Sequence, residues 1–174
     1  MFSLYCAILI RIKKIQRIGV NYDKVICFYS HIKINFNRGD KVVVVEGKIK
    51  GKARPRFNTK TGRAFTPGDT ITYENWIRFA YQEQCGVHLN GAIRARIEVY
   101  YKIPKSYPKK RVQAIRDGLE LPLKKPDSDN IAKIVLDSLN KIAFDDDSQV
   151  ADLRVIKKWT EDVERIEFEL EEIK

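Results

Sequence analysis

The sequence predicts an α/β domain of the α+β kind, in which a small mixed or antiparallel sheet packs against two or three helices. Residues 93–101 are apolar at every second position, from Ile93 to Tyr101, and this alternation is typical of a half-buried strand. Residues 129–142 carry apolar side chains three and four positions apart, which predicts a helix with one face on a core. A hydrophobic content of 44% suffices to build that core.

The other elements are predicted from the same patterns, namely the alternation typical of strands and the three- and four-residue spacing typical of helices, and from turn residues. Val42–Glu46 is a β-branched run that stops at Gly47, which indicates a strand. Asp69 or Thr70 is expected to cap a helix that runs to about Gln84 and stops at Gly86. The remaining predictions are a basic loop over 48–68, a short helix near 109–117, and strands over 150–158 and 165–173.

Residues 1–40 differ from the rest because they mix apolar and basic side chains without a sustained period. We predict an atypical N-terminal extension over 1–40 and a catalytic domain over 41–174. One hypothesis is a mis-assigned start, since Arg38-Gly39-Asp40 can be encoded by a sequence that resembles a bacterial ribosome-binding site before a GUG codon within 42–44. The alternative is a genuine appendage that packs on the domain. Mass spectrometry of the natively expressed protein distinguishes the two.

The N-terminal and sulfur-containing residues bear on localisation. Arg11 interrupts the apolar start too soon for a membrane span, so no membrane partner is expected. Cys6, Cys27 and Cys85 are odd in number and lack metal-ligand spacing, which favours reduced thiols in a cytoplasmic protein. The two histidines are too isolated to build a metal site.

Charge is distributed unevenly along the chain. The net charge is +10, and residues 1–126 hold 26 Lys and Arg against 9 Asp and Glu. Residues 127–174 hold 7 Lys and Arg against 14 Asp and Glu. A basic body with an acidic patch is what a metal-dependent enzyme acting on a polyanion requires.

The acidic patch begins at a predicted helix start. Asp127 and Asp129 lie two positions apart there, Lys133 follows one helical turn later, and Asp137 one turn beyond that. After the helix come three consecutive carboxylates, 145–147. Clustered carboxylates repel one another unless a hard cation such as Mg²⁺ or Mn²⁺ neutralises them. The alternative is that these residues only cap the helix and form a polar turn.

The sequence that contains these residues resembles the RusA family of Holliday junction resolvases. The resemblance covers about residues 43–171 and rests on several motifs in order. These are Gly51-Lys52-Ala53-Arg54-Pro55-Arg56, Thr66-Pro67, Tyr73-Glu74, Pro104-Lys105-Ser106, Lys125-Pro126-Asp127-Ser128-Asp129-Asn130 with Lys133, Asp137 and Leu139-Asn140, and Asp146-Asp147-Ser148-Gln149-Val150. It implies a RusA-like fold and a Mg²⁺-dependent endonuclease, with Mn²⁺ as a possible substitute. It also implies paired symmetric cuts in branched DNA, as in recombination and repair, and an association with prophages.

The resemblance also implies roles for individual residues. Asp127, Asp129 and Asp147 match the catalytic acids that bind Mg²⁺, and Lys133 matches the catalytic lysine. Lys133 would stabilise charge on the phosphate or orient the attacking water. Asn130 and Asp146 are expected to support these residues. Asp137 is expected to support Lys133, and Asp145 to be a bystander.

DNA contacts are predicted outside this cluster. The loop after residue 47 places seven cations within sixteen residues, a composition suited to phosphate contacts. The candidates for DNA binding are Lys52, Arg54, Arg56, Lys60, Arg63, Lys109 and Lys110. Because a four-way junction has two-fold symmetry, and the resemblance implies the same, the expected assembly is a homodimer with two active sites.

Two other functions remain open from the sequence. One is a non-enzymatic basic DNA-binding protein, which predicts metal-independent binding without products. The other keeps the metal site and gives it flap DNA or RNA as a substrate.

Overall fold

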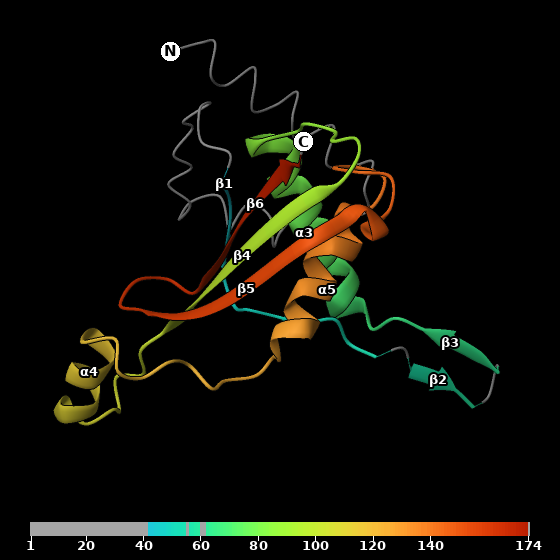
Figure 1. Ribbon diagram of the computed structural model, residues 1–174. Coiled ribbons are helices and arrows are strands. Elements are labelled where there is room, and N and C mark those ends of the chain that lie inside the picture. The colour runs from blue at the N-terminus through green and yellow to red at the C-terminus, as the bar shows by residue number, and fades with distance from the viewer. Residues whose placement is uncertain (1–41, 55, 60–61, 174) are drawn as a thin grey trace, which may run out of the picture. The chain divides into compact units, whose positions relative to one another are not determined.

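The computed structural model describes residues 42–54, 56–59 and 62–173, so the predicted extension over 1–40 lies outside the described part. The elements are β1 (Val42–Glu46), β2 (Arg56–Asn58), β3 (Arg63–Phe65), α3 (Gly68–Gln84), β4 (Ile93–Lys102), α4 (Lys109–Arg116), α5 (Ser128–Leu139), the 3-10 turn η2 (Asp147–Gln149), β5 (Val150–Thr160) and β6 (Arg165–Glu172). The predicted fold class is confirmed: a mixed sheet packs against helices (Figure 1).

The sheet has four strands in the order β1-β6-β4-β5. β6 runs antiparallel to both β1 and β4, whereas β4 and β5 are parallel. A parallel pair needs a long crossover connection, and residues 103–149 supply it with α4 and α5. The crossover therefore carries the acidic stretch from one end of the sheet to the other.

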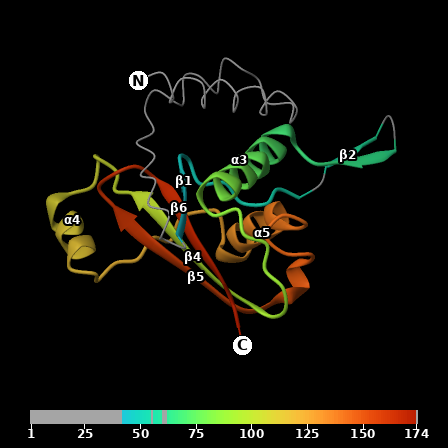
Figure 2. The ribbon, with the colours of Figure 1, turned by 90° about the horizontal axis from the view of Figure 1, so that it is seen from above.

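One face of the sheet is covered by α3 and α5, which also contact each other (Figures 1 and 2). Every second residue of β4, from Ile93 to Tyr101, faces these two helices. The side chains of these alternate residues are at most 3% exposed. Helix α5 contributes Ile131, Ile134 and Leu139, each fully buried. The predicted apolar face of this helix is thereby confirmed, and it fixes which side of α5 remains in solvent.

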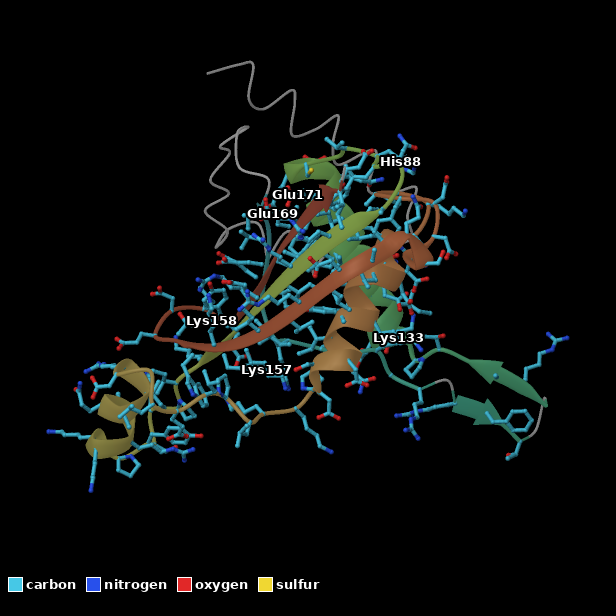
Figure 3. The ribbon with its side chains drawn as sticks, in the orientation of Figure 1. His88, Lys133, Lys157, Lys158, Glu169 and Glu171 are labelled. Carbon is cyan, nitrogen blue, oxygen red and sulfur yellow. The ribbon has the colours of Figure 1, made fainter. Side chains whose placement is uncertain are left out.

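The opposite face of the sheet carries paired charges. Lys158 Nζ lies 2.7 Å from Glu98 Oε2, and Arg165 Nε lies 2.6 Å from Glu167 Oε1. The C-terminal alternation is confirmed, because Ile166, Phe168 and Leu170 are buried in β6 while the glutamates between them face outward. In Figure 3 Glu169 lies on this strand.

Three element boundaries correct the predictions. Helix α3 begins at Gly68 after Pro67, so neither Asp69 nor Thr70 caps it, whereas Gly86 ends it at a φ of 66° as predicted. Helix α5 ends at Leu139, three residues early, because Lys141 adopts a φ of 63° and the chain turns back. The loop over 48–68 contains the hairpin β2–β3, whose three-residue strands are too short to show an alternating pattern.

Candidate active site

Three predicted site residues gather at the start of α5. Asp127 occupies the N-cap position, Asp129 lies in the first turn, and Lys133 follows one turn later. All three are exposed, and within the described ranges their side chains have no hydrogen-bond or ion-pair partner. Figure 3 shows Lys133 on the solvent side of α5. Their charged groups are thus available to a ligand.

The helix-cap alternative does not account for Asp127. Its backbone carbonyl accepts the first helical hydrogen bond, from the Ile131 N–H at 3.1 Å, but its carboxylate makes no capping bond. An N-cap aspartate normally uses its side chain on the N–H groups of the first turn. Here the carboxylate is left free beside the positive end of the helix dipole.

Contacts from distant parts of the chain hold the segment that leads into α5. The Lys157 ammonium on β5 donates to the carbonyl oxygens of Lys124 at 2.8 Å and Pro126 at 2.7 Å. Gly51 lies against Pro126, and a Cβ at Gly51 would stand 2.7 Å from the Pro126 Cβ. The backbone N–H of Lys52 donates to the Asn130 carbonyl at 2.9 Å. A glycine is required at position 51 because a larger residue would push the acidic helix start away.

The side chain of Lys52 is engaged inside the domain. Its ammonium lies 2.6 Å from a Glu74 oxygen on α3 and 2.8 Å from an Asp137 oxygen on α5. Burial lowers the pKa of Lys52, but hydrogen bonds and charges from Asp137 and Glu74 outweigh it, so the pKa lies above its usual value. Asp137 thus pairs with Lys52, which corrects the expectation that it supports Lys133. Lys52 was also predicted to bind DNA; in this pairing its side chain is 22% exposed, and its ammonium is held by two carboxylates.

The turn after α5 is held by its own residues. The Asp146 carboxylate accepts the Ser148 N–H at 3.0 Å, and the Gln149 side-chain carbonyl accepts the N–H groups of Asp145 and Asp146. Hydrogen bonds from the Ser148 hydroxyl and N–H hold the pKa of Asp146 below its usual value. The Gln149 amide also donates to the Gly91 carbonyl at 3.0 Å. Asp146 therefore supports the turn, and Asp147 is presented to solvent within it.

The two acidic sites lie at opposite ends of the sheet. Burial, followed by the charges of Glu164 and Asp127, raises the pKa of Tyr101 to about 12, which locates Asp127 near the end of β4. Asp147 instead precedes Val150, which pairs with Ile93 at the start of β4. Strand residues advance about 3.3 Å each, so Ile93 and Tyr101, eight positions apart, are separated by about 26 Å. Figure 1 likewise shows η2 and residues 124–127 at opposite ends of α5.

Consequently one chain does not assemble the predicted set of three metal ligands. Within residues 42–54, 56–59 and 62–173, no three Asp, Glu, His or Cys side chains are grouped so as to hold a metal ion. Asp127 and Asp129 share one end of α5 and fit as two oxygen ligands of a hard cation. Asp147 is too far away to join them within the same chain.

The predicted DNA-binding residues fall on two separate elements. Arg54, Arg56 and Arg63 are exposed on and beside the β2–β3 hairpin, and Lys60 lies outside the described residues. The hairpin also exposes 65% of Phe57. On α4, Lys109 and Lys110 are exposed. The backbone of Lys52 bonds to Asn130 in α5, and beyond it the β2–β3 hairpin projects outward from the domain (Figure 1).

Sequence reasoning missed Lys157 and the partner role of Glu74. Lys157 interrupts an apolar series on the helix-facing side of β5, where Val155 and Trp159 pack against the core. A lysine in such a position is a usable signal, because a charged group there needs partners. Glu74 gave no comparable signal, since its burial depends on how α3 and α5 pack.

A mixed α/β domain with exposed carboxylates beside basic elements has the features of a nuclease acting on DNA. Residues 46–171 match the family described as endodeoxyribonuclease RusA. The uncharacterized protein YqaN of Bacillus subtilis (strain 168) is 32% identical over 134 residues, which cover 74% of this chain and 94% of that protein. The chain therefore belongs to the RusA endodeoxyribonuclease family.

Family membership confirms the resemblance seen in the sequence and implies nuclease activity on Holliday junctions, which are branched DNA. It sets aside the alternative of a non-enzymatic DNA-binding protein. None of the described helices has the length and apolar character needed to cross a membrane.

Proposed function

We propose that this chain is a divalent-metal-dependent endonuclease that resolves four-way DNA junctions by paired, symmetric phosphodiester hydrolysis in recombination and repair. Asp127, Asp129 and Asp147 are the proposed metal ligands, with Mg²⁺ as the cofactor and Mn²⁺ as a substitute. Lys133 is the proposed catalytic lysine. The observation that carries the proposal is that Asp127, Asp129 and Lys133 lie exposed at one end of α5, with no side-chain partner among the described residues.

The separation of Asp147 from the other two acids supports a homodimer. A magnesium ion binds oxygen ligands at about 2.0–2.1 Å, so all its ligands must converge on one point. Since Ile93 and Tyr101, near the two ends of β4, are about 26 Å apart, a second copy is the source we propose for the third carboxylate. Two-fold symmetry would then give two equivalent sites, as paired cuts in a symmetric junction require.

The chain's own residues have distinct tasks in this proposal. When bound, the metal would acidify a water molecule and polarise the scissile phosphate. The Lys133 ammonium, one turn from Asp129, would stabilise negative charge that develops on the phosphate. The exposed cations of the β2–β3 hairpin and of α4 would contact the DNA backbone, which gives affinity that falls steeply with salt.

The test is cleavage of synthetic DNA substrates by the full chain. We expect Mg²⁺-dependent cleavage of a four-way junction, loss of products in EDTA, and loss of products with Asp129→Asn or Lys133→Ala while junction binding persists. Near wild-type cleavage by both variants would show that the site is wrongly placed. A flap, a linear duplex and an RNA hairpin in the same assay determine whether the junction is the preferred substrate.

A further inference from the structure

Lys157 is a lysine in the middle of a strand; among the described residues its ammonium hydrogen-bonds to two backbone carbonyls and lies 5.9 Å from the Tyr101 ring centre. Its two hydrogen bonds, at 2.8 Å and 2.7 Å, go to the carbonyls of Lys124 and Pro126, which are 33 and 31 positions away in the chain. Residues 124–126 belong to no helix or strand, so they lack the regular backbone bonds that would fix them. The Lys157 ammonium supplies that fixation at two points.

The location of these two carbonyls ties Lys157 to the proposed metal ligands. The Pro126 carbonyl belongs to the peptide unit that continues into Asp127, the N-cap residue of α5. Holding this peptide unit sets the direction in which the Asp127 carboxylate leaves the backbone. It also sets where α5 begins, and hence where Asp129 stands relative to Asp127.

Other contacts fix the same segment from different elements. The Lys124 ammonium lies 5.7 Å from the Tyr101 ring centre and 5.4 Å from that of Trp159, within cation–π range. A Cβ on Gly51 would meet the Asn130 Cβ at 3.0 Å as well as Pro126. The segment is therefore held between the end of the sheet and the chain around Gly51, with Lys157 as its direct hydrogen-bond donor.

We propose that Lys157 is a positioning residue for metal binding: it clamps residues 124–126 to β5 and so holds Asp127 and Asp129 in the geometry that receives the cation. This inference rests on the proposed function, because it needs these two aspartates to be ligands. Residues that orient metal ligands typically change metal affinity or activity by 10–100-fold when they are removed. Lys157 has no place in the reaction itself.

Lys158 provides a matched control in the next position. Its ammonium pairs with Glu98 on the other face of the sheet, at 2.7 Å, and has no contact with residues 124–127 among the described residues. In Figure 3 Lys157 and Lys158 lie on opposite sides of β5. Replacing either lysine by methionine removes one charge from the same strand, but only Lys157→Met removes the hydrogen bonds to residues 124 and 126.

The experiment measures Mn²⁺ binding to the full-length protein by electron paramagnetic resonance, without DNA, together with the Mg²⁺ dependence of junction cleavage. For Lys157→Met we expect Mn²⁺ affinity about tenfold weaker or more, and a matching rise in the Mg²⁺ needed for half-maximal cleavage. Junction binding in EDTA should be unchanged. Lys157→Arg, which keeps a donor that can reach both carbonyls, should recover most of the affinity, and Lys158→Met should behave as wild type.

Equal Mn²⁺ affinities for Lys157→Met, Lys158→Met and wild type would overturn the inference. Failure of the proposed function gives a different result, namely no Mn²⁺ binding and no junction cleavage by the wild-type protein. If thermal melting shows that Lys157→Met does not fold, Gly51→Ala displaces the same segment through its contact with Pro126. That variant should also bind Mn²⁺ more weakly, and wild-type affinity for a folded Gly51→Ala would contradict the clamp.

Discussion

The start of α5 and the turn after it hold their acidic residues in opposite ways. At the start, Asp127 and Asp129 have free carboxylates, and the backbone that carries them is held by Lys157 from a distant strand. In the turn, Asp146 and Gln149 form a capping box of their own, and Asp147 is free between them. The backbone at the start of α5 is therefore held by a side chain from a distant strand, whereas the turn after α5 is held mainly by hydrogen bonds among its own residues.

This difference separates two kinds of acidic residue within a single run of sequence. Asp137 and Asp146 have partners and contribute to the fold, whereas Asp127, Asp129 and Asp147 have none among the described residues. A carboxylate that makes no contact contributes little to stability. Its presence in a fixed place is better explained by a ligand that is bound only during function.

The largest expected effect contrasts two aspartates of the same helix. Asp129→Asn should lower junction cleavage by at least about 100-fold, the scale of losing a group that stabilises charge in the reaction. Its urea-unfolding midpoint should be unchanged, because the side chain is exposed and unpartnered. Asp137→Asn should instead destabilise the fold by about 1–3 kcal/mol, because Lys52 loses a charged partner, and keep most of the activity. If Asp129→Asn lost stability but kept cleavage, and Asp137→Asn lost cleavage but kept stability, the distinction between free and paired acids would be wrong.

A smaller effect is expected from the capping box. Asp146→Ala should slightly lower the urea-unfolding midpoint, because the N-cap carboxylate no longer accepts the Ser148 N–H. Gln149→Ala removes the bonds to Asp145, Asp146 and Gly91, so it should loosen Asp147 and lower cleavage about tenfold. Ser148→Ala, which keeps the backbone donor, serves as the control. Unchanged cleavage by Gln149→Ala would mean that the turn does not position Asp147.

The same contrast explains what the sequence could predict. The strands, α5 and the self-contained turn depend on periodicity or on residues within five positions of one another, so local patterns were sufficient. The clamp by Lys157 depends on the register of β5 against the crossover, and the pairing of Lys52 with Asp137 depends on packing between a loop and a helix. The sequence pattern can indicate that Lys157 needs partners, but it does not identify which residues those partners are. For the same reason the sequence placed Asp147 beside Asp127, although the fold separates them.

The smallest expected effect is the pH dependence of the unfolding free energy that comes from Tyr101, close to Asp127 at the end of β4. Burial raises the pKa of Tyr101 to about 12, above its ordinary value of 10.0. The stability that comes from the neutral phenol is complete below pH 10 and is lost as the pH rises toward 12, because the unfolded chain ionises first. Tyr101→Phe should therefore reduce the alkaline loss of unfolding free energy by up to about 1.4 kcal/mol per pH unit in that window. Identical slopes for both proteins in urea titrations at pH 9 to 11.5 would contradict this.

The central claim is that the free acids at the two ends of α5 form one nuclease centre across a homodimer. Its most direct test mixes chains that carry Asp129→Asn with chains that carry Asp147→Asn, each inactive alone, and measures cleavage of a four-way junction. In a mixed dimer one composite site has lost both acids and the other has lost neither. The account predicts that mixing restores nicking at one site per dimer without restoring paired cuts. If the mixed dimers form and remain inactive, each chain uses its own Asp147 and the claim is wrong.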